Sequence, residues 1–130
     1  MLMSSDALLL AIDQGTTSSR AILFDANLRA QATAQIELIQ SFPRPGWVEH
    51  DPDTIWQDCV TCCRQVLSQV EGGAERVAGL GITNQRETIV LWERRSGRAL
   101  HPALVWQDRR TTEICAGKRA AGLEAEIRQR

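Results

Sequence analysis

Leu8–Asp25, LLLAIDQGTTSSRAILFD, is the stretch from which the fold of this chain can be worked out. It contains two apolar runs, 8–12 and 21–24, separated by a polar turn, and each run is too short for a typical globular helix. Neither run alternates between apolar and polar residues, so we expect both to be strands that are buried on both faces of a sheet. The sequence therefore predicts a β-hairpin with a polar turn at its tip.

The turn of this hairpin combines a glycine and four hydroxyl residues with a carboxylate and an arginine: Asp13-Gln-Gly-Thr-Thr-Ser-Ser-Arg20. Glycine allows the backbone to approach a ligand closely, and hydroxyl groups can donate to phosphate oxygens. A carboxylate at the end of a rigid strand is suited to hold a hydrated magnesium ion. These groups indicate a phosphate-handling hairpin, although it has neither the P-loop nor the dinucleotide-binding spacing. An ordinary polar turn, with side chains bonded to their own backbone, is the alternative.

The composition is ordinary for a soluble globular protein. The chain has 130 residues, of which 43% are hydrophobic and 24% charged, and its net charge is −1. This length is sufficient for one domain with a core, and the charge gives no reason to expect nucleic acid or an anionic membrane as a partner. No apolar run approaches the length of a membrane span, and the N-terminus lacks the basic region of a signal peptide. The expected location is the cytoplasm.

A third strand and a long helix are expected after the hairpin. Alternation over 29–38 predicts a half-exposed strand, which completes a three-stranded antiparallel meander. After a proline-rich loop, Asp51 and Pro52 suit the N-cap and first position of a helix, whose apolar face continues to about Val70. The four cysteines lack the spacing of a zinc site, so we expect free thiols that pack as small apolar residues.

The sequence of the second half predicts a parallel strand, a further strand with a less clear pattern, and a helical C-terminal segment. The apolar run 77–83 suits a buried strand that is joined to the meander through the helix as a βαβ unit. A further strand is expected over 88–92, and a second helix should open near Asp108, with Asp108 or a nearby threonine as its cap.

Four polar residues, Asn84-Gln-Arg-Glu87, separate the strands expected over 77–83 and 88–92. They follow a buried strand, where open α/β sheets place ligands. Arg86 and Glu87 offer a donor fork and a two-oxygen acceptor for neighbouring hydroxyl groups, and the indole of Trp106 is suited to cover the carbon skeleton of a small polyol. A solvated bend and a plain core tryptophan are the alternatives that the pattern leaves open.

Four segments resemble the FGGY carbohydrate kinase family in order and spacing: AIDQGTTSSRAILFD, PGWVEHDP, GITNQRETIVLWE and VWQDRRT. The resemblance extends from Leu8 to about Ile127, and NQRET is similar to the glycerol-phosphorylating members rather than to the pentulose kinases. It implies an α/β fold of the ribonuclease H-like kind, found in the actin-like ATPase superfamily. Such a domain has a mixed sheet with an N-terminal three-stranded antiparallel meander and flanking helices.

The same resemblance implies a site for ATP, Mg²⁺ and glycerol, and phosphorylation of glycerol to sn-glycerol 3-phosphate. By this similarity, the residues that contact nucleotide phosphates are Thr16, Thr17, Ser18 and Arg20. By the same similarity, Asp13 is expected to be the magnesium-associated catalytic carboxylate. The residues expected in the glycerol pocket are Arg86, which is also expected to be catalytic, Glu87 and Trp106.

The family's enzymes are several times longer than this chain. Residues 1–130 are therefore expected to be the incomplete N-terminal part of the first kinase domain, inactive without the second domain. The resemblance is compatible with a homo-oligomeric full-length enzyme. Three other hypotheses stay open: a kinase for another polyol or sugar, a nucleotide-gated switch of the actin or heat-shock-chaperone kind, and a truncated product without function.

Overall fold

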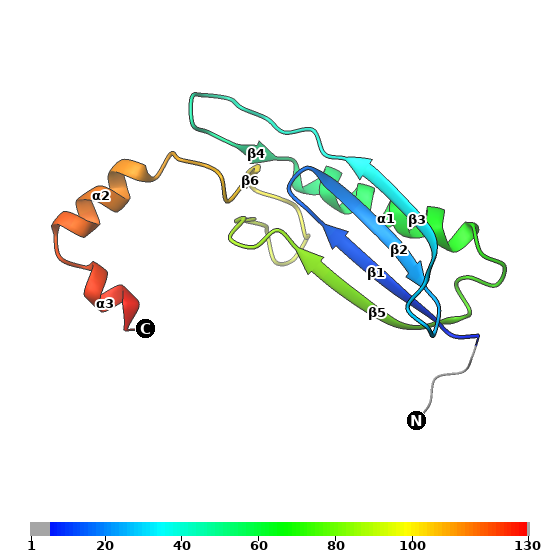
Figure 1. Ribbon diagram of the computed structural model, residues 1–130. Coiled ribbons are helices and arrows are strands. Elements are labelled where there is room, and N and C mark those ends of the chain that lie inside the picture. Colours follow the sequence, from blue (N-terminus) through cyan, green and yellow to red (C-terminus); the bar gives the residue numbers. More distant parts are fainter. Residues whose placement is uncertain (1–5, 130) are drawn as a thin grey trace.

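A four-stranded mixed sheet with a long helix against one face forms the body of the molecule (Figure 1). The computed structural model describes residues 6–129. Strand β1 (Leu8–Gln14) pairs antiparallel with β2 (Ser18–Phe24), which pairs antiparallel with β3 (Ala30–Glu37). On its other side, β1 pairs parallel with β5 (Val77–Asn84). The order β3-β2-β1-β5 confirms the meander and the parallel crossover strand.

The core lies between the sheet and helix α1 (Pro52–Ser68). Alternate residues of the meander face this helix, and the buried cluster consists of Leu8, Leu10, Ala21, Leu23, Ala32, Ala34, Cys62 and Val66. Burying one Val- or Leu-sized side chain contributes about 1.5–3 kcal/mol, so this single layer is the main source of stability. The helix begins as expected, because the side chain of Asp51 accepts a hydrogen bond from Asp53 N at 3.1 Å and Pro52 follows it.

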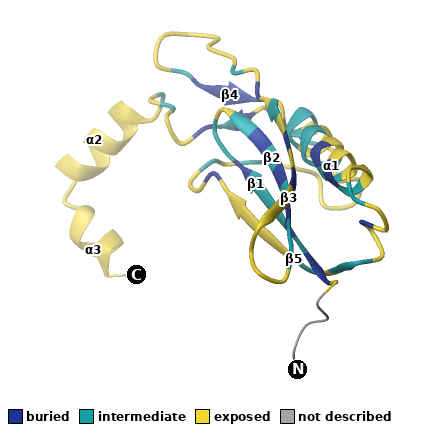
Figure 2. Ribbon diagram, turned by 45° about the vertical axis from the view of Figure 1, so that its right-hand side comes forward, coloured by how far each residue is buried: buried dark blue, intermediate teal, exposed yellow. Residues whose placement is uncertain are grey.

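The expectation that β1 and β2 are buried on both faces is wrong. Residues of both strands alternate between buried and partly buried, because α1 covers one face. Strand β5 is largely exposed, as Figure 2 shows. On it, Leu80 is 57% and Ile82 is 67% exposed, although the register partner of Leu80 is the core residue Leu10. An uninterrupted apolar run thus indicates a strand without indicating which of its faces is covered.

The second half differs from expectation in its short elements. Strand β4 (Glu49–His50) pairs with β6 (Ala103–Leu104), whereas 88–92 contributes isolated bridges at Ile89 and Trp92 rather than a regular strand. The chain ends in α2 (Thr112–Ala120) and α3 (Glu124–Arg128), which extend away from the sheet and have no buried residues (Figures 1 and 2). The N-cap of α2 is Thr111, which is the nearby threonine expected as the alternative to Asp108, although its side chain makes no cap hydrogen bond.

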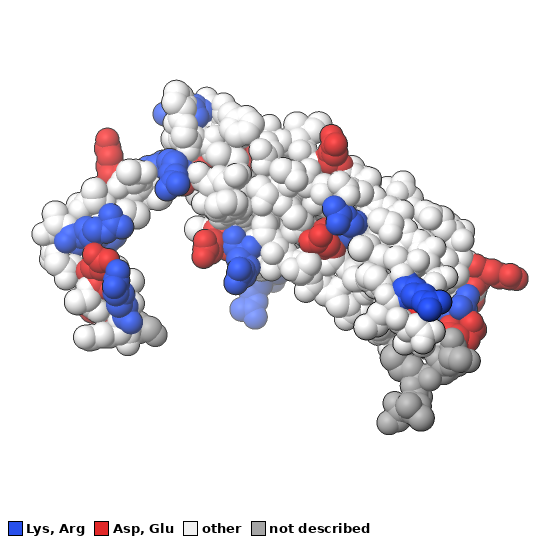
Figure 3. Space-filling model, in the orientation of Figure 1, with Lys and Arg blue, Asp and Glu red and all other residues white. Residues whose placement is uncertain are grey.

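The cysteines are free, in agreement with the sequence, although they are not all buried. Cys62 is buried in the core and Cys115 is exposed. Burial raises the pKa of the Cys62 thiol, which makes it a poor nucleophile. Acidic and basic side chains are interspersed over the face in Figure 3. Among residues 6–129, no helix has both the length and the apolar character needed to cross a membrane.

Candidate functional site

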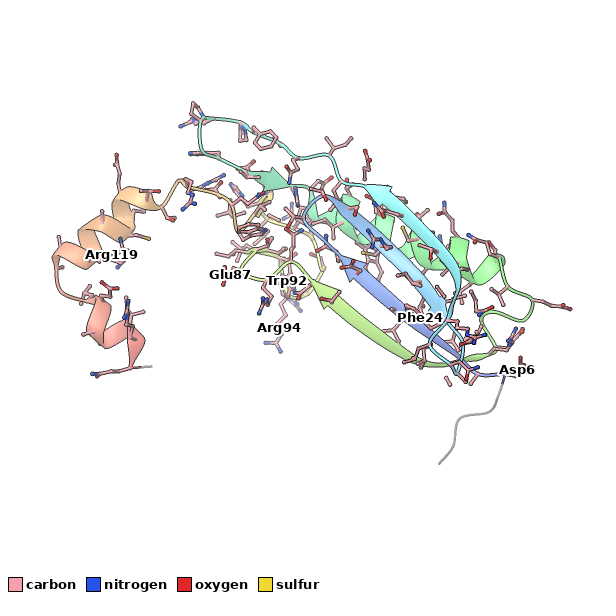
Figure 4. The ribbon with its side chains drawn as sticks, in the orientation of Figure 1. Asp6, Phe24, Glu87, Trp92, Arg94 and Arg119 are labelled. Carbon is pink, nitrogen blue, oxygen red and sulfur yellow. The ribbon has the colours of Figure 1, made fainter. Side chains whose placement is uncertain are left out.

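Two polar loops meet at one end of the sheet. In the parallel pairing of β1 and β5, Gln14 lies opposite Asn84, so the turn at 15–17 and the loop at 85–88 leave the sheet at the same end (Figure 1). Figure 4 labels Glu87 on the loop beyond β5. This is the edge at which open α/β sheets bind ligands. The structure thus brings together the two polar segments that the sequence singled out.

The turn at 15–17 presents backbone donors at its tip. Gly15 N donates to Ser18 O at 2.9 Å, and Thr17 O accepts from Leu38 N at 2.9 Å, so both ends of the turn are fixed. Within the described part of the chain, no protein acceptor receives the N–H groups of Thr16 and Thr17. Unpaired N–H groups in a turn form a concave site that favours an anion.

Not all four hydroxyl residues of the turn reach this tip. Thr16, Thr17 and Ser18 are at least partly exposed, whereas Ser19 is fully buried on the side of α1. The Cys62 thiol donates to Ser19 O at 3.4 Å, and Ser19 Oγ has no hydrogen-bond partner. The expectation that the Ser19 hydroxyl can donate to a phosphate is therefore wrong, because the alternation of side chains along β2 turns Ser19 into the core.

A polar row crosses the sheet face opposite α1. Asp13, Arg20 and Gln35 occupy register positions next to one another on β1, β2 and β3. Arg20 Nε donates to Gln35 Oε1 at 2.9 Å, and Arg20 Nη1 lies 3.9 Å from Asp13 Oδ2. Both charged side chains stay partly exposed, so each can still meet a ligand.

Asp13 is the one carboxylate of this row that could hold a metal ion. Among residues 6–129, no group of three or more His, Cys, Asp or Glu side chains is placed to hold a metal ion. Mg²⁺ is commonly held by one or two carboxylates together with waters and substrate phosphates, rather than by a protein cage. Asp13, beside the turn at 15–17 with its unpaired N–H groups, fits that mode.

The loop at 85–88 holds its two charged residues outward. Arg86 and Glu87 are exposed, and neither forms an ion pair with another described residue. Glu87 has φ 66°, in the left-handed region. Such a conformation costs an L-residue about 1–2 kcal/mol and persists only where its surroundings impose it. Here Thr88 Oγ1 donates to Gln85 Oε1 at 2.9 Å, which closes the loop around Glu87.

A buried amide network joins the two loops. Gln85 Nε2 lies 3.2 Å from Gln14 Oε1 and 3.4 Å from Gly15 O, and Gln14 Nε2 donates to Gly15 O at 2.8 Å. His50 Nδ1 lies 3.3 Å from Gln85 Nε2, and burial lowers the pKa of His50, which favours the neutral imidazole. Because an amide N–H donates, Nδ1 is the acceptor.

Sequence reasoning missed this network. The alternation of side chains along β1 could have revealed it. Gln14 is an even number of residues from the core residues Leu8 and Leu10, so its side chain lies on the same face of the strand and points inward. A polar residue at an inward position needs a partner, which Gln85 supplies.

Trp106 connects the turn at 15–17 with the loop at 85–88. Its indole Nε1 donates to Thr16 Oγ1 at 2.9 Å, and its backbone N donates to Thr88 Oγ1 at 3.3 Å. The side chain is 52% exposed, so it is not a plain core tryptophan.

An ionic brace holds the segment that carries Trp106. Arg110 Nη2 lies 2.7 Å from Glu49 Oε1 and 2.9 Å from Asp108 Oδ2, and its guanidinium stacks 3.7 Å from the centre of the Trp47 ring. Asp108 Oδ2 also accepts from Val48 N at 2.7 Å. The hydrogen bonds from Arg110 hold the pKa of Asp108 down at about 2. The brace fixes Asp108 and Arg110, which follow Trp106 in the chain, against residues 47–49. Val105, which precedes Trp106, is fixed to the same segment by the hydrogen bond from its N to Val48 O.

Comparison with known proteins identifies a family. The FGGY family of carbohydrate kinases, N-terminal domain, matches residues 8–130. A glycerol kinase of Ralstonia nicotianae is 57% identical over 122 residues, covering 94% of this chain and 24% of the relative. One from Methylobacterium nodulans is 52% identical over 123 residues, covering 95% and 24%. The chain thus spans about a quarter of the length of the curated relatives that it matches.

Solved structures agree with this match. A glycerol kinase of Plasmodium falciparum with ADP has a TM-score of 0.77 at 30% identity, over 88% of this chain and 23% of that chain. A ligand-bound xylulose kinase of Lactobacillus acidophilus has a TM-score of 0.86 at 19% identity, over 95% and 24%. The second likeness shows the fold alone.

Proposed function

Because the chain belongs to the FGGY family of carbohydrate kinases, we propose that it supplies the phosphate subsite and part of the acceptor subsite of an ATP-dependent glycerol kinase. The product is sn-glycerol 3-phosphate. In this proposal, residues 1–130 are the N-terminal part of the first kinase domain, and the enzyme works in the cytoplasm. The observation that carries the proposal is the meeting of the turn at 15–17 with the loop at 85–88, joined by Gln85 and Trp106.

The turn is the part suited to the phosphates of ATP. The N–H groups of Thr16 and Thr17 and the hydroxyls of Thr16, Thr17 and Ser18 are donors, and Arg20 adds a positive charge. Asp13 would hold Mg²⁺, which neutralises phosphate charge when bound. Phosphoryl transfer depends mostly on positioning and on stabilising charge, and the fixed turn provides both.

The loop at 85–88 is the part suited to glycerol. Arg86 donates to neighbouring hydroxyl groups and Glu87 accepts from them, and the exposed Trp106 ring covers the carbon skeleton. Arg86 also lies on the loop that faces the phosphate turn, so its charge is available to the phosphoryl group during transfer.

A kinase for another polyol or sugar is the second candidate. The observation that favours it is the likeness to a xylulose kinase from Rhodospirillum rubrum, which is 31% identical with a TM-score of 0.73 over 87% of this chain and 23% of that chain. An acceptor panel of glycerol, xylulose and gluconate separates the two.

The experiment uses a chimera in which residues 8–130 replace the matching segment of the Ralstonia nicotianae glycerol kinase. A buried polar partner left unpaired costs about 1–3 kcal/mol, so Glu87→Ala should raise the KM for glycerol about 5- to 150-fold with little change for ATP. Glu75→Ala, at an exposed glutamate before β5, is the matched control. An unchanged KM for glycerol in Glu87→Ala would remove this loop from the acceptor site.

A further inference from the structure

Two hydrogen-bonding groups from distant parts of the sequence meet at the tip of the turn. Trp106 Nε1 and Thr16 Oγ1 are 2.9 Å apart although 90 residues separate them along the chain. An indole N–H can only donate, so the Thr16 oxygen must accept. A hydroxyl group has one hydrogen and can accept at the same time, so the Thr16 hydrogen is left for another acceptor.

The acceptor for that hydrogen is not supplied by the described residues. Within residues 6–129, the Thr16 side chain donates to no protein group, and the N–H groups of Thr16 and Thr17 likewise have no acceptor. Three donors therefore gather at one tip without a protein partner. A phosphoryl oxygen is the kind of acceptor that such a group receives well, because hydrogen bonds to a charged acceptor are the stronger ones.

We propose that Trp106 is a positioning residue for the phosphate turn: its indole N–H occupies Thr16 Oγ1 and thereby directs the Thr16 hydroxyl hydrogen toward a phosphoryl oxygen. This inference rests on the proposed function and assigns Trp106 a role beyond covering the acceptor. The Trp106 side chain then contributes to both subsites. Its ring covers the acceptor, and its indole nitrogen positions the phosphate turn.

The Trp106 backbone is held independently of Thr16. Its N–H donates to Thr88 Oγ1 at 3.3 Å, and Val105 N next to it donates to Val48 O at 3.1 Å. Because the side chain is 52% exposed, Trp106→Phe removes the N–H without opening a cavity in the core. The substitution therefore removes the N–H while an aromatic ring stays in place, and the cycle with Thr16 below separates the loss of the nitrogen from the smaller ring.

The test measures the KM for MgATP and for glycerol in the chimera described above. Loss of one hydrogen bond of about 0.5–1.5 kcal/mol corresponds to about 2- to 12-fold, so Trp106→Phe should raise the KM for ATP by that factor. The KM for glycerol should change by a smaller factor, because the phenyl ring still presents an aromatic face to the acceptor, although it is smaller than the indole. Trp92→Phe, at a tryptophan that is 58% exposed elsewhere, is the matched control.

A double-mutant cycle separates positioning from a general structural effect. Thr16→Val should raise the KM for ATP, and Trp106→Phe added to it should have no further effect, because the partner is already gone. Thr16→Ser keeps the hydroxyl and should retain the sensitivity to Trp106→Phe. Additive effects, or a change in the KM for glycerol alone, would overturn the inference and leave the proposed function standing. A folded chimera that uses neither ATP nor glycerol would overturn both.

Discussion

Replacing Glu87 by glycine should stabilise the fold but weaken glycerol binding. Its φ of 66° lies in the left-handed region, which costs an L-residue about 1–2 kcal/mol and costs glycine nothing. Glycine also adds freedom to the unfolded chain, so Glu87→Gly should raise the free energy of unfolding of the 130-residue chain by only about 0.5–1 kcal/mol. Urea titration measures this gain.

Leu28 provides the control for that prediction. It has φ 59° in the β2–β3 turn, far from the site, so Leu28→Gly should give a similar gain. In the chimera, Glu87→Gly should also raise the KM for glycerol, whereas Leu28→Gly should not. A destabilised Glu87→Gly chain would show that this backbone conformation is not strained.

His50 should make stability depend on pH. Burial lowers its pKa from the ordinary 6.5, so the unfolded chain takes up a proton at a pH where the folded chain does not. The free energy of unfolding should therefore fall as the pH decreases below about 6.5. His50→Gln should flatten this part of the curve, and His101→Gln, at an exposed histidine, should not. Equal slopes in urea titrations of the wild type and of His50→Gln would contradict this.

At the scale of elements, the brace between the β4 segment and the residues before α2 depends on a guanidinium. Arg110 reaches Glu49 and Asp108 together and stacks on Trp47, and a lysine ammonium reproduces neither the fork nor the stacking. Arg110→Lys should lower the thermal unfolding midpoint of the chain. The neighbouring Arg109, which is exposed, gives the matched control Arg109→Lys, for which we expect no change. Equal midpoints for the two variants would remove the brace from the account.

The elements that local pattern determines could be predicted from the sequence. The alternation in β3 and the cap at Asp51 are signals within a few residues, and both are confirmed. The covered face of β1 could not be predicted, because it depends on where α1 lies in space. Within the candidate site, the charged residues Asp13, Arg86 and Glu87 could be recognised from the sequence. The inward Gln14–Gln85 contact was not, since it joins residues 71 positions apart.

At the scale of the whole molecule, β5 leaves apolar surface uncovered. It pairs with β1 on one side, and Leu80 and Ile82 are more than half exposed. Exposed apolar surface beside an unpaired strand edge favours association. Joint replacement of Leu80 and Ile82 by Thr should therefore reduce self-association of the 130-residue chain in sedimentation velocity. Ile39→Thr, at a residue outside β5 that is 87% exposed, should have little effect. Equal effects would point to a general apolar surface rather than to β5.

The central claim is that this chain carries the phosphate subsite of a glycerol kinase. Its most direct test is the rate of glycerol 3-phosphate formation by the chimera with and without Asp13→Asn, in MgATP and glycerol. The account predicts glycerol-dependent turnover that Asp13→Asn lowers by orders of magnitude while the unfolding midpoint stays almost the same, because a partly exposed carboxylate adds little to folding. A folded chimera without turnover, or an Asp13→Asn variant with the parent's kcat, would contradict it.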